Sequence, residues 1–226
     1  MKKTNKILLT ALCAVLLVTV SVMGTVAYLI DYEKVENTFT VGDVDIKLDE
    51  ADVLEDGTLN PEAEGRVTEN EYHLIPGQTY IKDPTMTVVA GSEESYLRIL
   101  VTITNAKELK AIFGEDFLPE NYVEGWDPAI WPCAGITADE DANTLTYEFR
   151  YYKTVSTYDS EGDLVLEPLF TAFTLPGDKV NGEQLATLAG LKITAEGHAI
   201  QRVALDTADA AWEAFDAQRA QEQENP

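Results

Sequence analysis

The sequence predicts an all-β protein, an antiparallel β-sandwich with short accessory helices and a C-terminal helix. Three observations lead to this fold class. Apolar residues recur at every second position in several stretches, most clearly from Leu97 to Ile103. Turn-forming pairs such as Pro76-Gly77 separate these stretches. Helical spacing is confined to residues 109–113 and to the C-terminus, so most of the chain has to form short strands, as in a sandwich.

The N-terminus has the features of an export signal. Three lysines precede an uncharged apolar run over residues 7–23, and small residues follow at Thr25 and Ala27. We therefore expect residues 1–27 to be a signal peptide that is cleaved before Tyr28, with cleavage after Tyr28 as the second choice. An uncleaved membrane anchor is the alternative, because the apolar run is near the lower limit for spanning a bilayer. The chain is exported in either case.

The mature protein is strongly acidic. The chain of 226 residues has a formal charge of −24, and loss of the signal lysines leaves 13 basic against 40 acidic side chains, a net charge of −27. Such a surface repels nucleic acid and favours cations and basic partners. The length suits one sandwich domain, which we place at residues 28–205, followed by a helix and polar tail at 206–226. Membrane contact is expected only through the uncleaved signal.

The first predicted strand follows the signal closely. Phe39 and Val41 alternate with threonines, whereas Val44, Ile46 and Leu48 alternate on the opposite parity. A bulge or a sheet-switching bend between the two sets would let both face the core.

Polar segments and turns separate the later strands. Residues 49–71 are rich in acids and predict a solvated excursion rather than core. The strand at residues 78–89 contains Pro84, which places that part at an edge or a bulge. Residues 159–163 are expected to close a hairpin onto a strand at 164–175.

Two helices and one more strand complete the prediction. Leu109, Ile112 and Phe113 have helical spacing, and Gly114 is placed to end that helix. A last strand covers residues 191–203, with a break in its alternation near Gly197. The terminal helix, with Thr207 as its N-cap, has one face formed by Ala208, Ala211, Trp212, Phe215 and Arg219.

The sequence provides little support for a catalytic site. A zinc peptidase needs histidines and acids at spacings that let them converge, and His73 and His198, the only histidines, have no such neighbours. Cys133 is the one cysteine after the signal. We interpret it as a buried inert thiol, with an interchain disulfide or a nucleophile as the alternatives. We assign no catalytic residue.

Calcium is the most credible ligand that the sequence offers. Two acidic turns place oxygen side chains at alternate positions, as hard cations require: Asp139, Asp141 and Asn143 in the first, and Asp159, Glu161 and Asp163 in the second. The alternative is that both are solvated turns. Five aromatic residues are either core or a sugar-stacking platform: Trp126, Trp131, Tyr151, Tyr152 and Tyr158.

Several segments carry a family resemblance through their order along the chain. They are A-Y-L-I-D and N-T-F-T-V-G-D-V-D-I-K-L near the signal, P-G-Q-T-Y-I-K-D-P-T-M-T-V, S-Y-L-R-I-L-V, P-L-F-T-A-F-T-L-P, and H-A-I-Q before D-T-A-D-A-A-W. In this order they resemble secreted bacterial proteins of the TasA/camelysin type, which have a SipW-dependent type of signal peptide. The resemblance implies a jelly roll, cleavage by a dedicated signal peptidase, and assembly in which the N-terminal segment of one subunit completes the sheet of the next. For the camelysin branch it implies a metalloendopeptidase.

We therefore expect a secreted structural protein of the extracellular matrix or cell surface, a fibre or biofilm-matrix subunit that forms homopolymers. Its assembly strand would contain Leu29, Phe39, Val41, Val44 and Ile46, because strand addition takes affinity from main-chain hydrogen bonds and specificity from alternate side chains. Pairing of this strand within its own subunit is the alternative. The competing functions are a camelysin-like metalloendopeptidase and a carbohydrate-binding adhesive module.

Overall fold

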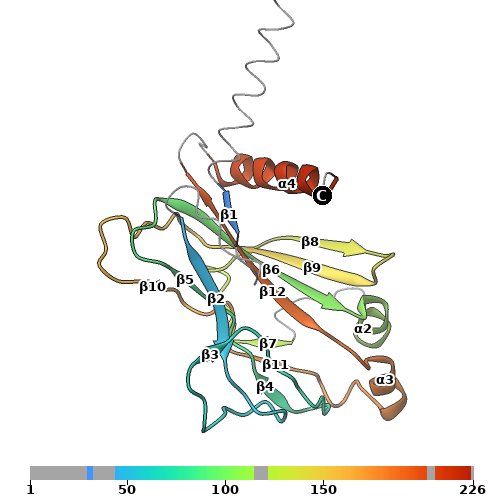
Figure 1. The fold of residues 1–226 in the computed structure, drawn as a ribbon. Coiled ribbons are helices and arrows are strands. Elements are labelled where there is room, and N and C mark those ends of the chain that lie inside the picture. Colours follow the sequence, from blue (N-terminus) through green and yellow to red (C-terminus); the bar gives the residue numbers. More distant parts are fainter. Residues whose placement is uncertain (1–29, 33–43, 115–121, 203–206, 225–226) are drawn as a thin grey trace, which may run out of the picture.

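The chain folds as layered antiparallel sheets with few helices, as Figure 1 shows. The computed structural model describes residues 30–32, 44–114, 122–202 and 207–224. Within these ranges the strands form three sheets in a sandwich-like arrangement, and a helix follows at the C-terminus. The predicted fold class is confirmed.

The largest sheet has five strands in the order β1-β12-β6-β9-β8, and every neighbouring pair is antiparallel. Its strands are β1 (Ile30–Tyr32), β6 (Ser95–Thr104), β8 (Cys133–Asp139), β9 (Thr144–Arg150) and β12 (Ile193–Gln201). The alternating residues that predicted a strand at 97–103 lie in β6, which occupies the middle of the sheet.

Two smaller sheets complete the structure. One has the order β10-β5-β2-β3 and the other the order β4-β11-β7. Their strands are β2 (Ile46–Ala51), β3 (Arg66–Val67), β4 (Thr79–Ile81), β5 (Thr85–Val88), β7 (Val123–Glu124), β10 (Leu164–Val165) and β11 (Ala172–Thr174).

The predicted strand at residues 78–89 is two strands in two different sheets. It divides into β4 and β5 on either side of Lys82-Asp83-Pro84. Because proline cannot donate to a strand ladder, the chain leaves one sheet here and enters the next. Pro84 lies in neither strand, so the expected edge or bulge within a single strand is wrong.

The hairpin expected at residues 159–163 is also not formed. The strand before it, β9, pairs with β6 and β8, whereas β10 pairs with β5 in another sheet. The turn therefore carries the chain from one layer to the other. The expected strand at 164–175 is likewise divided between β10 and β11.

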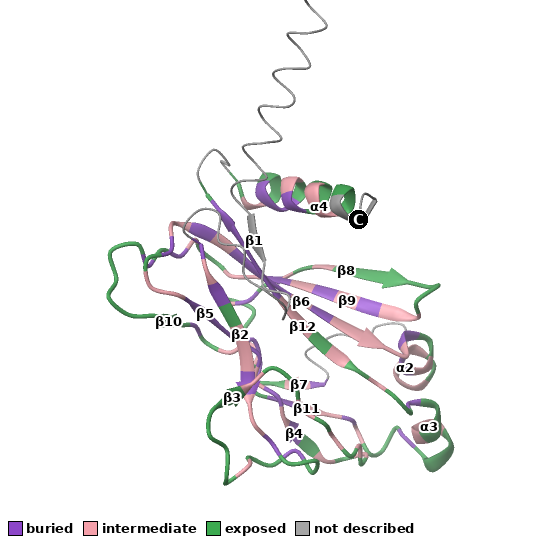
Figure 2. Ribbon diagram, viewed as in Figure 1, coloured by how far each residue is buried: buried purple, intermediate pink, exposed green. Residues whose placement is uncertain are grey.

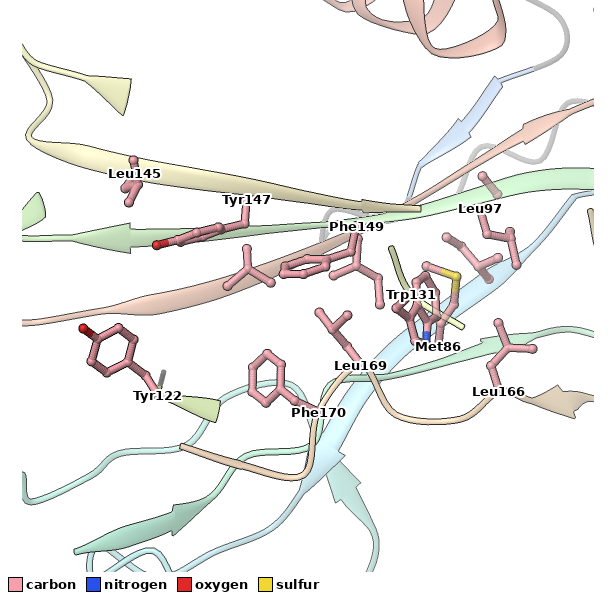
Figure 3. Packing of buried hydrophobic residues seen from close by; sticks show 14 of the residues in the cluster. Met86, Leu97, Tyr122, Trp131, Leu145, Tyr147, Phe149, Leu166, Leu169 and Phe170 are labelled. Carbon is pink, nitrogen blue, oxygen red and sulfur yellow. The ribbon is translucent and has the colours of Figure 1, made fainter. Parts of the chain in front are cut away.

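The core lies between the five-stranded sheet and the smaller sheets. Figure 3 shows Leu145, Tyr147 and Phe149 of β9 above Leu169 and Phe170, and Trp131 beside Met86. Each of these side chains is at most 6% exposed. Full burial of one large apolar side chain contributes about 1.5–3 kcal/mol, so this cluster is the main source of stability.

Three helices lie within the described ranges: α2 (Ala106–Phe113), α3 (Gly182–Thr187) and α4 (Ala208–Glu224). The predicted helix at 109–113 is α2, and Gly114 ends it with a φ of 100° that glycine adopts readily. Thr207 caps α4 as predicted, because its Oγ1 accepts a hydrogen bond from the Ala210 amide.

The break in alternation near Gly197 is not a bulge. β12 pairs with β6 without a shift of register from Ile193 to Gln201. The residues from Gly197 onward are buried on both parities, because the core covers one face and α4 covers the other, as Figure 2 indicates. Burial on both faces, and not a change of backbone geometry, produced the irregular pattern.

The acidic segment at 49–71 is only partly a solvated excursion. Glu50, at the end of β2, is 7% exposed and accepts hydrogen bonds of 3.0 and 2.8 Å from Lys82 Nζ. Val53 is also buried. The carboxylate is stable there because the ammonium group satisfies both of its oxygens.

Candidate functional site: the β12 edge and helix α4

The segment that follows the predicted cleavage site forms an edge of the largest sheet. β1 pairs antiparallel with β12, with Ile30 opposite Ile200, Asp31 opposite Ala199 and Tyr32 opposite His198. On its other side β12 pairs with β6 over nine residues. A short strand thus lies against a long strand that is itself firmly held in the sheet.

Helix α4 covers the outer face of this edge. Trp212 and Phe215 are each 1% exposed and, with Ala211, pack against Ile200 of β12. The Arg98 side chain of β6 lies beneath both rings, with its Cζ 4.5 Å from the centre of the Trp212 ring and 5.0 Å from that of Phe215. Cation–π contacts of this kind strengthen when the cation is desolvated.

Arg98 is 2% exposed, and its charge is neutralised by acids from two elements. Nη1 and Nη2 contact the two carboxylate oxygens of Asp216 on α4, with 3.1 Å from Nη1 to Oδ2, and Nη1 lies 3.4 Å from Glu148 Oε1 on β9. The bidentate geometry with Asp216 is the strong form of this ion pair. Arg98 thereby joins α4 to the middle of the sheet.

His198 completes the buried polar group. Arg98 Nε donates to His198 Nδ1 at 3.0 Å, so Nδ1 carries the lone pair and Nε2 carries the proton. Nε2 lies 3.1 Å from Glu196 Oε1, which also accepts from Arg219 of α4. The imidazole is completely buried and 4.7 Å from the Phe215 ring.

The environment keeps this histidine neutral. Burial lowers the pKa of His198 and the positive charge of Arg98 lowers it further, whereas Glu196 opposes both effects. Burial disfavours the charged form of Glu196, but the hydrogen bond from His198 and the charge of Arg219 bring its pKa below its ordinary value. The group is a structural link between α4 and β12.

Sequence reasoning did not find this cluster. The apolar face of α4 was predicted, but its partners on the sheet were not. The one available signal was Arg98 itself, a charge in the centre of a strongly apolar strand. Such a charge is buried only when opposite charges are supplied from elsewhere.

The proposed assembly residues divide into two groups. Val44 and Ile46 are 1% and 0% exposed in the subunit's own core, and Ile46 begins β2, which pairs with β5. Leu29, Phe39 and Val41 lie outside the described residues, as do the predicted cleavage positions Thr25, Ala27 and Tyr28. Of the segment between the predicted cleavage site and Val44, the structure describes only β1.

The two histidines lie in different parts of the structure. His73 is exposed in the segment before β4, whereas His198 is buried under α4. Over the described ranges, no group of three or more histidine, cysteine or acidic side chains is arranged to hold a metal ion. Cys133, at the start of β8, is half-buried, and its Sγ lies 3.6 Å from the Gly135 carbonyl oxygen.

Backbone amides already donate hydrogen bonds to side-chain oxygens of the first acidic turn. Asp139 Oδ1 accepts hydrogen bonds from the Asp141 and Ala142 amides at 3.0 and 2.9 Å. Asn143 Oδ1 accepts from the Lys107 amide at 2.9 Å and thereby satisfies a free donor at the start of α2. These contacts give the turn a structural role, and its binding of calcium stays a prediction.

The second acidic turn is connected to the neighbouring sheet through Asp163. Its carboxylate accepts from the Ala90 amide and from Lys47 Nζ, both at 3.0 Å. These hydrogen bonds lower the pKa of Asp163. Asp159 and Glu161 are exposed on the same turn, and calcium binding by these residues also stays a prediction.

The aromatic residues considered as a sugar platform are mainly core. Trp131 is 1% exposed, and its Nε1 donates to the Glu167 carbonyl at 3.0 Å. The Trp126 ring meets Phe149 edge to face. Tyr152 and Tyr158 are more than half exposed, and Tyr151 packs between Trp131 and Tyr152. A platform that includes both tryptophans is therefore wrong.

Comparison with known proteins identifies the first third of the chain. Residues 2–79 match the family model of the camelysin metallo-endopeptidase. This part of the chain is similar to camelysin-type proteins. The match covers β1, β2 and β3 and includes His73, but it ends before β6, β12 and His198. No curated protein and no solved structure matches the chain. Among the helices of its described residues, none is long and apolar enough to cross a membrane.

Proposed function

We propose that this chain is a TasA/camelysin-type protein and a secreted structural subunit of the extracellular matrix or cell surface, a fibre or biofilm-matrix subunit that assembles by strand donation. In the polymer, β1 of one copy occupies the β12 edge of the next. The observation that carries the proposal is the position of β1, a three-residue edge strand directly after the predicted cleavage site.

The β12 edge is well suited to accept a strand. Its pairing with β6, the core on one face and α4 on the other hold β12 in place without any help from β1. β1 pairs only with residues 198–200, and no described strand pairs with residues 193–197 on that side. In the same register, a donor segment extending from Leu29 to Glu36 would reach Thr194. The polymer would therefore gain strand pairs that β1 alone does not make.

Exchange of an identical strand between copies has a low energetic cost, because the strand forms the same hydrogen bonds with the next subunit that it makes within its own. The predicted signal holds the donor segment at the membrane until cleavage, so assembly would begin only outside the cell. N-terminal sequencing of the secreted protein should give Tyr28 or Leu29. A start at Met1, or beyond Phe39, would contradict this order of events.

A disulfide between β1 and β12 tests strand donation directly. Asp31 and Ala199 are opposite each other, so Asp31→Cys/Ala199→Cys in a Cys133→Ser background places two cysteines in a cross-strand pair. Oxidation of assembled mature protein should then give a ladder of covalent multimers on a denaturing gel. A single monomer band from the same fibres would show that β1 stays in its own subunit. The control is the double cysteine variant oxidised before assembly, which should be trapped as monomer and should not polymerise.

Deletion of residues 28–36 provides an independent test. The truncated chain should retain its circular-dichroism spectrum, because the main core comes from β2, β5, β6 and β9. It should fail to form fibres in electron micrographs. Equal polymerisation of the truncated and full mature chains would show that this segment is not the donor.

The name of the matched family favours one second candidate, a metallo-endopeptidase. Of the two histidines, His73 lies within the matched residues. Proteolysis by the purified mature protein that is abolished by a chelator and by His73→Ala would support this candidate. Activity that survives both treatments would contradict it.

A further inference from the structure

The opposite edge of the five-stranded sheet is formed by β8, an open and nearly uncharged strand. No described strand pairs with its outer side, and Ile136, Thr137, Ala138 and Asp139 are all exposed. From Cys133 to Ala138 it has no charged side chain, although the mature protein has a net charge of −27. Figure 2 shows the end of β8 as an exposed strand at the margin of the sheet.

Soluble proteins usually protect such an edge, because its free N–H and C=O groups pair readily with another strand. Lysine, proline and inward-pointing charges are common means of protection, and none occurs between Cys133 and Ala138. A bulge lies between Cys133 and Gly135, but the register with β9 is regular from Gly135 to Asp139. Residues 135–139 are therefore regular, and four of the five, 136–139, are exposed.

We propose that β8 is a second interface of this protein, at which two copies pair antiparallel through residues 135–139 about a two-fold axis at Thr137. The two sheets then become one continuous sheet of ten strands. This contact lies at the opposite edge from β1 and is independent of strand donation. In a fibre it would join neighbouring filaments side by side.

The side chains of β8 favour this register. Thr137 would face Thr137 of the second copy, which is a favourable cross-strand pair. Ile136 and Ala138 lie on the core side of the sheet, opposite Tyr147 and Leu145 of β9. In the dimer, Ile136 of each copy would contact Ala138 of the other. Ile136 is 45% exposed in the single subunit, and the contact would cover it.

Charge favours a second copy of this chain in the antiparallel orientation. Asp139 would face Gly135 of the other copy, so no like charges would be directly opposite. A parallel pair in register would place the two Asp139 carboxylates side by side, which is unfavourable. Because both molecules are strongly acidic, the uncharged strip along β8 is where their backbones can approach at the lowest electrostatic cost.

The contact is small, so a weak dimer is expected. A pair of five-residue segments buries less than the roughly 1,000 Å² typical of a stable interface. Association should strengthen as sodium chloride is raised, because salt screens the repulsion between the two acidic molecules. In a polymer many such contacts would act together, and their combined strength would be far greater.

Cysteine trapping tests the register in the full mature chain. In a Cys133→Ala background, Thr137→Cys places two thiols opposite each other across the two-fold axis, and mild oxidation should give a covalent dimer. Gly135→Cys is the matched control. It lies on the same strand and the same face with open space around its Cβ position. In the proposed register, residue 135 of one copy would be about 13 Å from residue 135 of the other, too far for a disulfide. Equal trapping at the two positions, or none at position 137, would overturn the proposal.

A charge at the axis tests the energetics. Thr137→Asp would place two carboxylates opposite each other and should raise the dissociation constant of the dimer about fivefold. Sedimentation velocity, run before fibres form, measures this constant. Thr137→Asn, similar in size but neutral, should leave it within about twofold. Dimerisation that is unaffected by Thr137→Asp would overturn the proposal. Both variants should still form single filaments, so failure of the β8 contact is distinguishable from failure of strand donation.

Discussion

Replacement of the two histidines one at a time gives the sharpest test of the cluster under α4. His198→Ala removes the acceptor for Arg98 Nε, which then lies buried without that hydrogen bond, at a cost of about 1–3 kcal/mol. It also removes the ring that packs on Phe215, worth about 0.5–1.5 kcal/mol. We expect the free energy of unfolding to fall by about 1.5–4.5 kcal/mol, the sum of the two effects. His73→Ala, on an exposed segment, should change it by less than about 0.5 kcal/mol.

The pH dependence separates this explanation from a simple loss of packing. His198 has a lowered pKa in the folded protein, so near pH 6.5 the unfolded chain takes up a proton that the folded chain does not. The stabilising contribution of neutral His198 is therefore complete above about pH 6.5. It is lost progressively as the pH falls from there to the folded-state pKa. The pKa of Glu196 is also lowered from its ordinary value of 4.5. Glu196 therefore also contributes stability that is lost as the pH falls, but at pH values below about 4.5.

Urea unfolding followed by circular dichroism at pH 7.5, 6.5 and 5.5 measures both effects. Wild-type protein and His73→Ala should lose stability as the pH falls through this range, whereas His198→Ala should show a flatter profile. Two results would refute the reasoning. One is equal stability loss from the two substitutions at pH 7.5. The other is a pH profile that His198→Ala leaves unchanged.

Three further predictions concern the rest of the structure. Glu50→Ala leaves the ammonium of Lys82 buried without its partner and should cost about 3–5 kcal/mol by urea unfolding, whereas Glu50→Leu with Lys82→Met should cost far less. Gly57→Ala should cost more than about 1 kcal/mol, because φ is +77° and a Cβ would lie 2.5 Å from a tyrosine ring atom, while Gly65→Ala, in open space, should be nearly neutral. Millimolar calcium should raise the melting temperature or promote association more than sodium of equal ionic strength. Equal effects of the two salts would show that they act only by screening charge, and would contradict a calcium site.

The sequence predicted several parts of the candidate site, but it did not predict how these parts pack together. The sequence placed β6 and the apolar face of α4, and it named the segment from Leu29 onward as part of the assembly element. It did not show that α4 packs on Arg98 and His198, or that β1 pairs with β12. Arg98 and Asp216 are 118 residues apart, and no local pattern connects two positions at that separation.

The sequence by itself determined the elements whose signals are local, because spacing and capping depend on neighbouring residues. The alternation at Leu97–Ile103, the cap at Thr207 and the glycine at position 114 are of this kind. Only the tertiary structure decided which sheet each strand joins, why the chain changes sheets at Pro84, and why β12 is buried on both faces. The physical reason is that strand partners and buried ion pairs are selected by packing between distant segments. A carboxylate such as Glu50 has the local sequence of a solvated loop, and only the lysine that the fold brings to it allows its burial.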